Sequence, residues 1–343
     1  MEKRKTVSGR TDGKFRVIIA LALAALVLSA CFAGCEREEN GKDKIVLNEV
    51  THSIFYAPQY LAMALGYFGD ENIEITLVNG GGADKTMIAL LTGEADIGLM
   101  GPEATIYTVL EGKKDHPIVF GQLTKRDGSF LVGRTESPGF DWKGLEGKRI
   151  IMGRQGGVPA MTLQYILNKH GYRDGENIIM DYSVEFNMLA PAFTAGTGDF
   201  VPLFEPAAST LINSGKGYIV ASIGKESGEV PYTAYTAIKS RIADNPELFE
   251  RFLRAVKKAT DYLFSHSAEE CAKLLLPYFD GSSESDVLTA LKAYIANDTW
   301  VRSPVMTEES FNRLQDIMEN AGKLEKRADF RIVADNSIAE KVG

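Results

Sequence analysis

Residues 93–103 read Gly93-Glu94-Ala95-Asp96-Ile97-Gly98-Leu99-Met100-Gly101-Pro102-Glu103, and this stretch decides the fold. The apolar run 97–100 is short and lies between an acidic turn and a Gly-Pro pair, so it predicts a buried strand. Pro102 at a first helical turn predicts that a helix follows, as far as Leu110. The stretch therefore indicates a strand that runs into a helix, with Glu103 at the junction.

The same pattern recurs in a later part of the chain. The residues Ala89, Gly93, Asp96 and Pro102 are echoed, at nearly the same spacing, by Ala192, Gly196, Asp199 and Pro206. In the second copy the acid Glu205 comes directly before the proline. Two copies of one strand–helix unit, each with an acid at the end of its strand, predict two similar lobes that face each other.

The composition is that of a folded globular protein. The chain has 343 residues, of which 45% are hydrophobic and 24% charged, and this is enough for two lobes with a sizeable core. The formal net charge is −8. An acidic body argues against nucleic acid as a partner. Of three cysteines, Cys271 falls in an apolar helical pattern and predicts a packed core thiol, without a disulfide framework.

Residues 1–30 have the pattern of a lipoprotein signal peptide. A region rich in Lys and Arg is followed by the aliphatic run 17–28 and by Leu-Ser-Ala directly before Cys31. This order predicts export and lipidation of Cys31, with Cys35 as the alternative. Residues 31–43 would then be a polar tether. The other interpretation is an uncleaved membrane anchor helix, for which the apolar run is short.

Strand and helix patterns alternate through the rest of the chain and predict an α/β protein with mainly parallel sheets flanked by helices. We expect lobe one to comprise residues 44–130 and 233–343, and lobe two residues 131–232. Four amphipathic stretches after Asn245 predict extra helices on lobe one. Two chain crossings would form a hinge, and clefts between lobes joined in this way close on ligands.

Several motifs resemble the substrate-binding proteins of the nitrate/sulfonate/taurine (NitT/TauT) type, which include binders of thiamine pyrimidine precursors. The motifs are Tyr56-Ala-Pro-Gln-Tyr-Leu-Ala62, Leu65-Gly-Tyr-Phe68, Val78-Asn-Gly-Gly-Gly-Ala-Asp84 and Gly93-x-x-Asp96. The resemblance implies a two-lobed clamp with the type II periplasmic-binding-protein fold. It also implies a receptor, lipid-anchored outside the cytoplasm, that delivers a small solute to the permease and ATPase of an ABC importer. We expect a monomer without a cofactor or a metal.

Ligands of open α/β sheets lie beyond the carboxyl ends of the strands, so the loops there supply the candidate ligand-binding residues. After the first strand, His52 is a candidate hydrogen-bond donor, and Phe55 and Tyr56 are candidates for stacking. Gly82 belongs to a glycine loop before a helix, where backbone N–H groups can hold an anion. The structural alternatives are a solvated histidine, aromatic side chains in the core, and a tight turn.

The acids Glu103 and Glu205 are the candidates that bear most on the ligand. Facing each other across a cleft, two carboxylates would repel unless a donor lay between them, so the pair favours an amine, an amidine or an aminopyrimidine. The alternative is that each acid only stabilises the start of its own helix.

The second lobe contributes further candidates. Arg154, followed by Gln155, could clamp an anionic group or pair with a cleft glutamate. Asn187 and Tyr232 are lesser candidates, for which ordinary packing is the alternative. Because of the arginine and the glycine loop, a sulfonate, nitrate or other small anion remains the second choice of ligand.

No catalytic residue is expected. The four histidines are scattered without a metal-binding pair, and the sequence has neither a nucleophile elbow nor a phosphate-binding loop with Lys-Ser/Thr. The pyrimidine synthases that share the resemblance carry a cysteine-rich motif, which this sequence lacks. The alternatives to an importer receptor are a lipoprotein co-sensor that transports nothing and, less favoured, a synthase-like enzyme.

Overall fold

The computed structural model describes residues 41–343, of which Asp43–Gly343 form one compact unit. The predicted signal peptide and both candidate lipidation sites, Cys31 and Cys35, lie outside the described residues. Among the described helices, none combines the length and the apolar character that crossing a membrane requires.

The first sheet has five strands in the order β2-β1-β3-β10-β4. Strands β1, β2 and β3 are parallel, whereas β10 runs antiparallel to both of its neighbours, β3 and β4. We call the elements around this sheet the first lobe. Its strands are β1 (Asp43–Glu49), β2 (Ile73–Asn79), β3 (Ile97–Met100), β4 (Pro117–Thr124) and β10 (Thr233–Ile238).

The second sheet repeats this arrangement in the order β7-β6-β8-β5-β9. Strands β6, β7 and β8 are parallel, and β5 runs antiparallel to β8 and β9. We call the elements around this sheet the second lobe. Its strands are β5 (Phe130–Gly133), β6 (Arg149–Ile151), β7 (Ile179–Asp181), β8 (Phe200–Leu203) and β9 (Tyr218–Ser222). Phe130, which the sequence placed at the end of lobe one, already belongs to this sheet.

The internal repeat has a structural basis. Strands β3 and β8 occupy the same position in their sheets, and the aspartate before each one binds the neighbouring strand. The Asp96 carboxylate accepts a hydrogen bond from Val46 N at 2.8 Å, and the Asp199 carboxylate accepts one from Arg149 N at 2.8 Å. Both aspartates therefore satisfy a backbone donor of the neighbouring parallel strand, and this explains the repeated aspartate.

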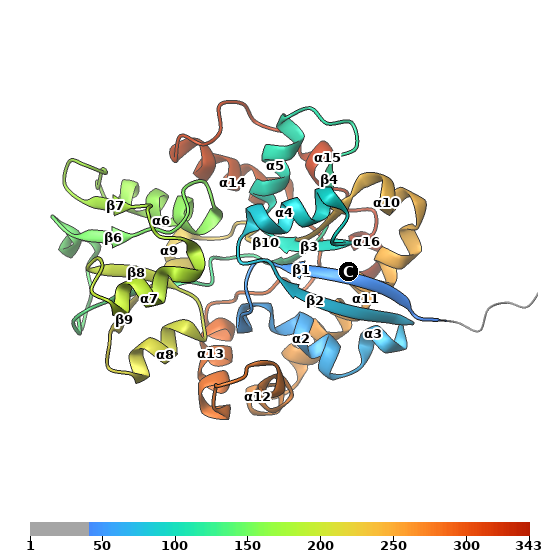
Figure 1. Cartoon of the computed structure of the whole chain (residues 1–343), viewed down its shortest axis with the longest axis horizontal. Helices are drawn as coiled ribbons and strands as arrows, with labels where there is room; N and C mark the ends of the chain where they lie inside the picture. Colours follow the sequence, from blue (N-terminus) through green and yellow to red (C-terminus); the bar gives the residue numbers. More distant parts are fainter. Residues whose placement is uncertain (1–40) are drawn as a thin grey trace, which may run out of the picture. The chain divides into compact units, whose positions relative to one another are not determined.

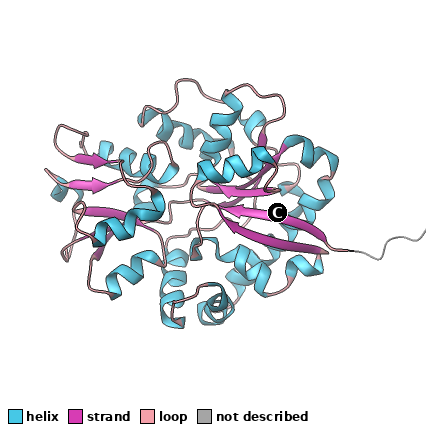
Figure 2. Cartoon of the chain, viewed as in Figure 1, coloured by secondary structure: helices cyan, strands magenta, loops and turns pink. Residues whose placement is uncertain are grey.

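Helices cover both faces of the first sheet, with α4 and α5 on one face and α2, α3 and α11 on the other (Figure 1). The colouring by secondary structure shows the same layering of strands and helices in the second lobe (Figure 2). The helices between β1 and β9, with η for a 3-10 helix, are η2 (Ile54–Tyr56), α2 (Ala57–Ala64), α3 (Tyr67–Asp70), α4 (Ala83–Thr92), α5 (Pro102–Leu110), η3 (Trp142–Leu145), α6 (Val158–Lys169), η4 (Phe186–Met188), α7 (Leu189–Thr194) and α8 (Ala207–Asn213).

The C-terminal third is helical, as the amphipathic pattern predicts. Its elements are α9 (Ile223–Ser227), α10 (Lys239–Asp244), α11 (Pro246–Ser265), α12 (Ala268–Leu275), η5 (Leu276–Tyr278), α13 (Glu284–Ala296), α14 (Glu308–Asn320), α15 (Phe330–Val333) and α16 (Ala339–Val342). Helices α11 and α12 pack on α2 of the first lobe. Helices α13 and α14 also contact the second lobe, through α8 and α6.

The two lobes pack against each other. One cluster of buried side chains joins residues of the first lobe, such as Phe55 and Ile97, to residues of the second, such as Val158 and Leu203. A separate cluster around Leu163 lies within the second lobe alone. The continuous cluster means that the structure has its lobes closed upon each other.

Candidate functional site

Three cavities lie between the lobes and are lined by residues from both. The first has a volume of about 190 Å³, and the second and third have about 40 Å³ each. Phe186 lines all three, and Glu103 lines the second and third. Together we call them the cleft cavities. All three adjoin the loop after β1, which places them at the carboxyl end of the first sheet.

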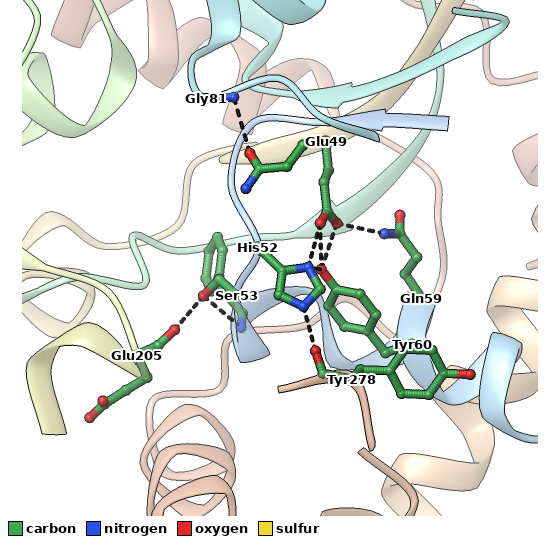
Figure 3. Close-up of polar contacts among 10 residues, drawn as sticks. Glu49, His52, Ser53, Gln59, Tyr60, Gly81, Glu205 and Tyr278 are labelled. Carbon is green, nitrogen blue, oxygen red and sulfur yellow. Dashed lines mark hydrogen bonds and ion pairs between the residues drawn. The ribbon is translucent and has the colours of Figure 1, made fainter. Parts of the chain in front are cut away.

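The loop after β1 is held by a buried carboxylate that the sequence analysis did not single out. Glu49 is fully buried, and it accepts hydrogen bonds from Gln59 Nε2 at 2.9 Å and from the Tyr60 hydroxyl at 2.6 Å (Figure 3). The Glu49 carboxylate also lies 2.9 Å from Nδ1 of His52, whose Nε2 lies 2.5 Å from the carbonyl oxygen of Tyr278. The network fixes the loop that lines the cleft cavities.

The pKa of His52 is raised above its usual 6.5, first because its ring bonds to the Glu49 carboxylate. A raised histidine pKa contributes stability that is complete below 6.5 and is lost as the pH rises through the folded-state pKa. We therefore expect His52→Gln to lower the free energy of unfolding more at about pH 5.5 than at about pH 8.5. Urea unfolding at the two pH values measures this, with His266→Gln as the control. Equal losses at both pH values would contradict a charged His52.

Glu103 is the most distinctive group of the site. It lies in the first turn of α5, after Pro102, and only 1% of it is exposed. Its Oε1 accepts a long hydrogen bond of 3.4 Å from Val158 N of the second lobe. Its Oε2 has no partner among residues 41–343. Burial raises the pKa of Glu103 to about 7, although the positive charge of Arg154 opposes the shift.

Aromatic side chains surround the cavity next to Glu103. Phe55, Tyr56, Phe186, Phe204 and Tyr232 all line the second cavity. Phe55 lies edge-on to Phe204 and Tyr232, with ring centroids 5.3 Å and 5.7 Å apart. Among the described residues, Oε2 of Glu103 has no partner. The cavity thus combines flat apolar walls with an unsatisfied carboxyl oxygen, a combination suited to a planar polar ligand.

Glu205 does not face Glu103 in a shared cavity, which departs from the predicted acid pair. It lines the first cavity, and its carboxylate accepts hydrogen bonds from N and Oγ of Ser209, both at 2.9 Å. Its backbone carbonyl accepts a hydrogen bond from Ser53 Oγ at 2.5 Å, and Figure 3 shows the carboxylate directed away from that contact. The carboxylate therefore caps α8, which is the structural alternative weighed for it.

Arg154 and Gly82 approach each other from opposite lobes and line the third cavity. Arg154 Nε lies 3.5 Å from Oδ1 of Asp84, in the first turn of α4. Gln155 is exposed and lines none of the cleft cavities.

The other candidates all line a cleft cavity. His52, Asn187 and Glu205 line the first, Phe55, Tyr56 and Tyr232 the second, Gly82 and Arg154 the third, and Glu103 the second and third. Thr51 of the loop after β1, Phe186 beside Asn187, and Phe204 also line the cleft cavities. Their signal was available, because each follows the end of a strand as closely as the residues that were chosen.

Within the part of the chain that the structure describes, no three His, Cys, Asp or Glu side chains converge as a metal site. The buried thiol of Cys271 lies in the first-lobe helix α12, away from the cleft cavities.

Two lobes of the same topology, joined by two crossings and enclosing cavities between them, define the class of protein: it has the type II periplasmic-binding-protein fold, as predicted. The sequence model of the family described as "NMT1/THI5 like" matches residues 54–270. A relative from Bacillus subtilis (strain 168), named "Putative binding protein YtlA", is 38% identical over 93% of this chain and 96% of its own. The chain therefore belongs to the NMT1/THI5-like family.

More distant matches comprise a sequence relative and solved structures that share the fold. The 4-amino-5-hydroxymethyl-2-methylpyrimidine phosphate synthase of Candida albicans (strain WO-1) is 27% identical over 64% of this chain and 66% of its own. The alkanesulfonate-binding protein SsuA from Xanthomonas axonopodis pv. citri, bound to MOPS, superimposes with a TM-score of 0.70 and 17% identity. That match covers 87% of this chain and 100% of SsuA. The nitrate-binding protein NrtA from Synechocystis PCC 6803 superimposes with a TM-score of 0.69 at 15% identity, and the match covers 88% of each chain.

Proposed function

We propose that this protein is the extracytoplasmic solute receptor of an ABC importer, and that it binds one small solute in the cleft cavities. The family membership, the relative named as a binding protein and the fold shared with sulfonate- and nitrate-binding proteins support this role. Closure of the lobes on the solute would present both lobes to the permease in one arrangement. Lipidation of Cys31, or of Cys35, would keep the receptor at the membrane.

The proposed ligand is a planar solute with N–H donors, such as an aminopyrimidine. The observation that carries this choice is Oε2 of Glu103, a buried carboxyl oxygen without a partner among the described residues, in a cavity with aromatic walls. A buried acceptor of this kind is costly until a donor satisfies it. A ligand N–H would supply the donor, and the rings would stack on its faces.

A small anion is the second candidate. Arg154 and the glycine loop at Gly82 line the third cavity, and the structural relatives include proteins named for alkanesulfonate and nitrate. Arg154 is already close to Asp84, and its charge also opposes the raised pKa of Glu103. An anion would have to compete for this arginine and lie near a buried carboxyl group, so we favour the N–H donor.

A thermal-shift panel tests the proposal. The purified protein is heated with 4-amino-5-hydroxymethyl-2-methylpyrimidine, with simpler aminopyrimidines, with alkanesulfonates and with nitrate. A ligand at a hundred times its Kd adds about 3 kcal/mol to stability, which is a clear rise in Tm. We expect aminopyrimidines to raise Tm and the anions to leave it unchanged. A rise with the anions alone would transfer the proposal to them, and no rise with any small solute would refute the receptor role.

Phe186 offers a test of the site itself. Because Phe186 lines all three cavities, Phe186→Ala should weaken ligand binding by about tenfold or more, the usual effect of losing an aromatic stacking partner. Met188→Ala, in the same short helix η4 but half exposed, is the matched control and should leave the affinity unchanged. Calorimetric titration of both variants measures the difference. Equal affinities would place the ligand elsewhere.

Two other roles remain testable beside the receptor. A synthase-like enzyme would consume the aminopyrimidine scaffold or modify one of its own histidines, and intact-mass measurement before and after incubation would show the change. A co-sensor would bind a membrane partner but carry no solute. Failure to co-purify with a permease and an ATPase, together with an empty ligand panel, would favour the co-sensor over the receptor.

A further inference from the structure

One short loop of the second lobe makes a set of polar contacts to the first lobe. The loop is residues 153–157, between β6 and α6, and we call it the latch loop. Gly153 and Gly156 both have φ of +83°, a backbone conformation that residues with a Cβ rarely adopt. The latch loop therefore holds a sharply turned shape, in which the Arg154 side chain reaches α4 and the carbonyl group of Gly156 reaches α5.

The contacts of the latch loop fall on two helices of the first lobe. The Tyr107 hydroxyl, on α5, donates a hydrogen bond to the carbonyl oxygen of Gly156 at 3.1 Å. Arg154 Nε lies 3.5 Å from the Asp84 carboxylate, on α4. Directly after the loop, Val158 N donates to Oε1 of Glu103 at 3.4 Å. All three contacts join one lobe to the other.

The carboxyl group of Glu103 is shared between the second lobe and the cleft. Oε1 faces Val158 N, whereas Oε2 is the atom without a partner among the described residues, and both Glu103 and Val158 line the second cavity. Docking of the latch loop thus adds a second-lobe donor to the group that the proposed function assigns to the ligand. The same carboxyl group therefore contacts the second lobe through Oε1 and is proposed to bind the ligand through Oε2.

We propose that the latch loop is a closure latch, and that Tyr107 and Asp84 are positioning residues that act on the ligand through Glu103. The effect on ligand affinity rests on the proposed function, whereas the effect of the latch loop on closure of the lobes does not. When the latch loop docks, Val158 N donates to Oε1 of Glu103. When the loop is undocked, Glu103 loses this partner from the second lobe.

The consequence is a population effect. A ligand that binds only the closed form has an apparent affinity reduced by the fraction of molecules that are closed. Removing a latch contact lowers that fraction without touching the walls of the cavities. The Tyr107 hydroxyl should account for about a fivefold change in the ratio of closed to open molecules, as one hydrogen bond does, and the half-exposed Asp84–Arg154 pair for about a twofold change.

The test compares wild type, Tyr107→Phe, Asp84→Asn and the double variant. Tyr218→Phe, on the edge strand β9, is the matched control, because its exposed hydroxyl makes no contact to the first lobe that the structure describes. Small-angle X-ray scattering gives the radius of gyration of each protein, without ligand and with 4-amino-5-hydroxymethyl-2-methylpyrimidine at saturation. Thermal unfolding without ligand checks that each variant is folded.

We expect the double variant to have a larger radius of gyration than wild type and Tyr218→Phe without the probe. A probe that binds the closed form should remove this difference at saturation, whereas a probe that does not bind should leave it unchanged. Where wild type binds the probe, the double variant should bind it about tenfold more weakly, through faster dissociation. If a folded double variant scatters like the control in both conditions, the latch is refuted, whether or not any ligand binds. If no ligand binds wild type but the double variant opens, the latch stands and the proposed ligand falls.

Discussion

Glu103→Gln should lower the affinity for the N–H-bearing ligand by about 10- to 100-fold, the usual effect of losing a hydrogen bond to a charged group. The glutamine keeps the size of the side chain and one oxygen for Val158 N. Its amide, however, would place a donor against the ligand N–H where the carboxyl group has an acceptor. Isothermal titration of wild type and variant with the same aminopyrimidine measures the loss.

The same substitution should raise stability. The folded state holds the proton of Glu103 up to a pKa of about 7, whereas the usual pKa of a glutamate side chain is 4.5. Unfolding therefore releases a proton in this range, and the stability of wild type should fall by about 3 kcal/mol as the pH rises from 4.5 through 7. Glutamine does not titrate, so the free energy of unfolding of Glu103→Gln should not fall in this way as the pH rises. Above pH 7 it should therefore exceed the free energy of unfolding of wild type.

Glu205→Gln is the matched control for this prediction. Its carboxylate binds Ser209 at the start of α8, and Glu205 lines neither of the two cavities that Glu103 lines, so the substitution should leave the affinity unchanged. If Glu205→Gln reduced the affinity as much as Glu103→Gln, the result would support the sequence-based prediction that both acids bind the ligand. If neither did, the ligand would not depend on either acid.

Gly101→Ala should weaken ligand binding through a steric clash. A Cβ at Gly101 would lie 2.0 Å from Oε2 of Glu103 and 2.8 Å from Cγ2 of Val158, both far closer than real contacts allow. The Glu103 side chain would have to turn away and the second lobe would have to shift. The backbone at Gly101 has φ of −69°, which alanine adopts without strain, so the fold of the first lobe should survive.

We therefore expect Gly101→Ala to lower the affinity by about 100-fold, since it removes both the closed arrangement and the orientation of Glu103. Circular dichroism and thermal unfolding should show a folded protein, and titration calorimetry should show the loss. Gly144→Ala, a position where a Cβ meets nothing within 4 Å, is the control. Unchanged affinity in Gly101→Ala would mean that the ligand does not require this close approach of the two lobes.

The fold was accessible from sequence because its signals are local. The run 97–100, bounded by an acidic turn and Gly-Pro, is β3, and the echo around Asp199 is β8 at the same place in the second sheet. Boundaries at the crossings were less accurate. Lobe two was expected to begin at residue 131, whereas Phe130 already pairs with Leu203 of β8 in the second sheet.

The candidate site was predictable as a set of loops but not as a set of orientations. Glu103 and Glu205 look alike in sequence. The difference between them is made by Ser209, whose N–H and hydroxyl turn the second acid toward its own helix. The role of Glu49 could not be predicted from local sequence. It binds His52, whose other ring nitrogen contacts the carbonyl group of Tyr278, 226 residues further along the chain. Gln155 points out of the cleft because the turn at Gly153 and Gly156 decides which side chains face inward.

The most direct test of the central claim is native mass spectrometry of the protein purified from its own cells, with the released solute identified by fragmentation. We predict one small solute per chain, with a planar ring and exchangeable N–H groups, and its absence from the Glu103→Gln protein purified in parallel. A protein that carries a sulfonate or nitrate, or a solute retained equally by Glu103→Gln, would contradict the assignment.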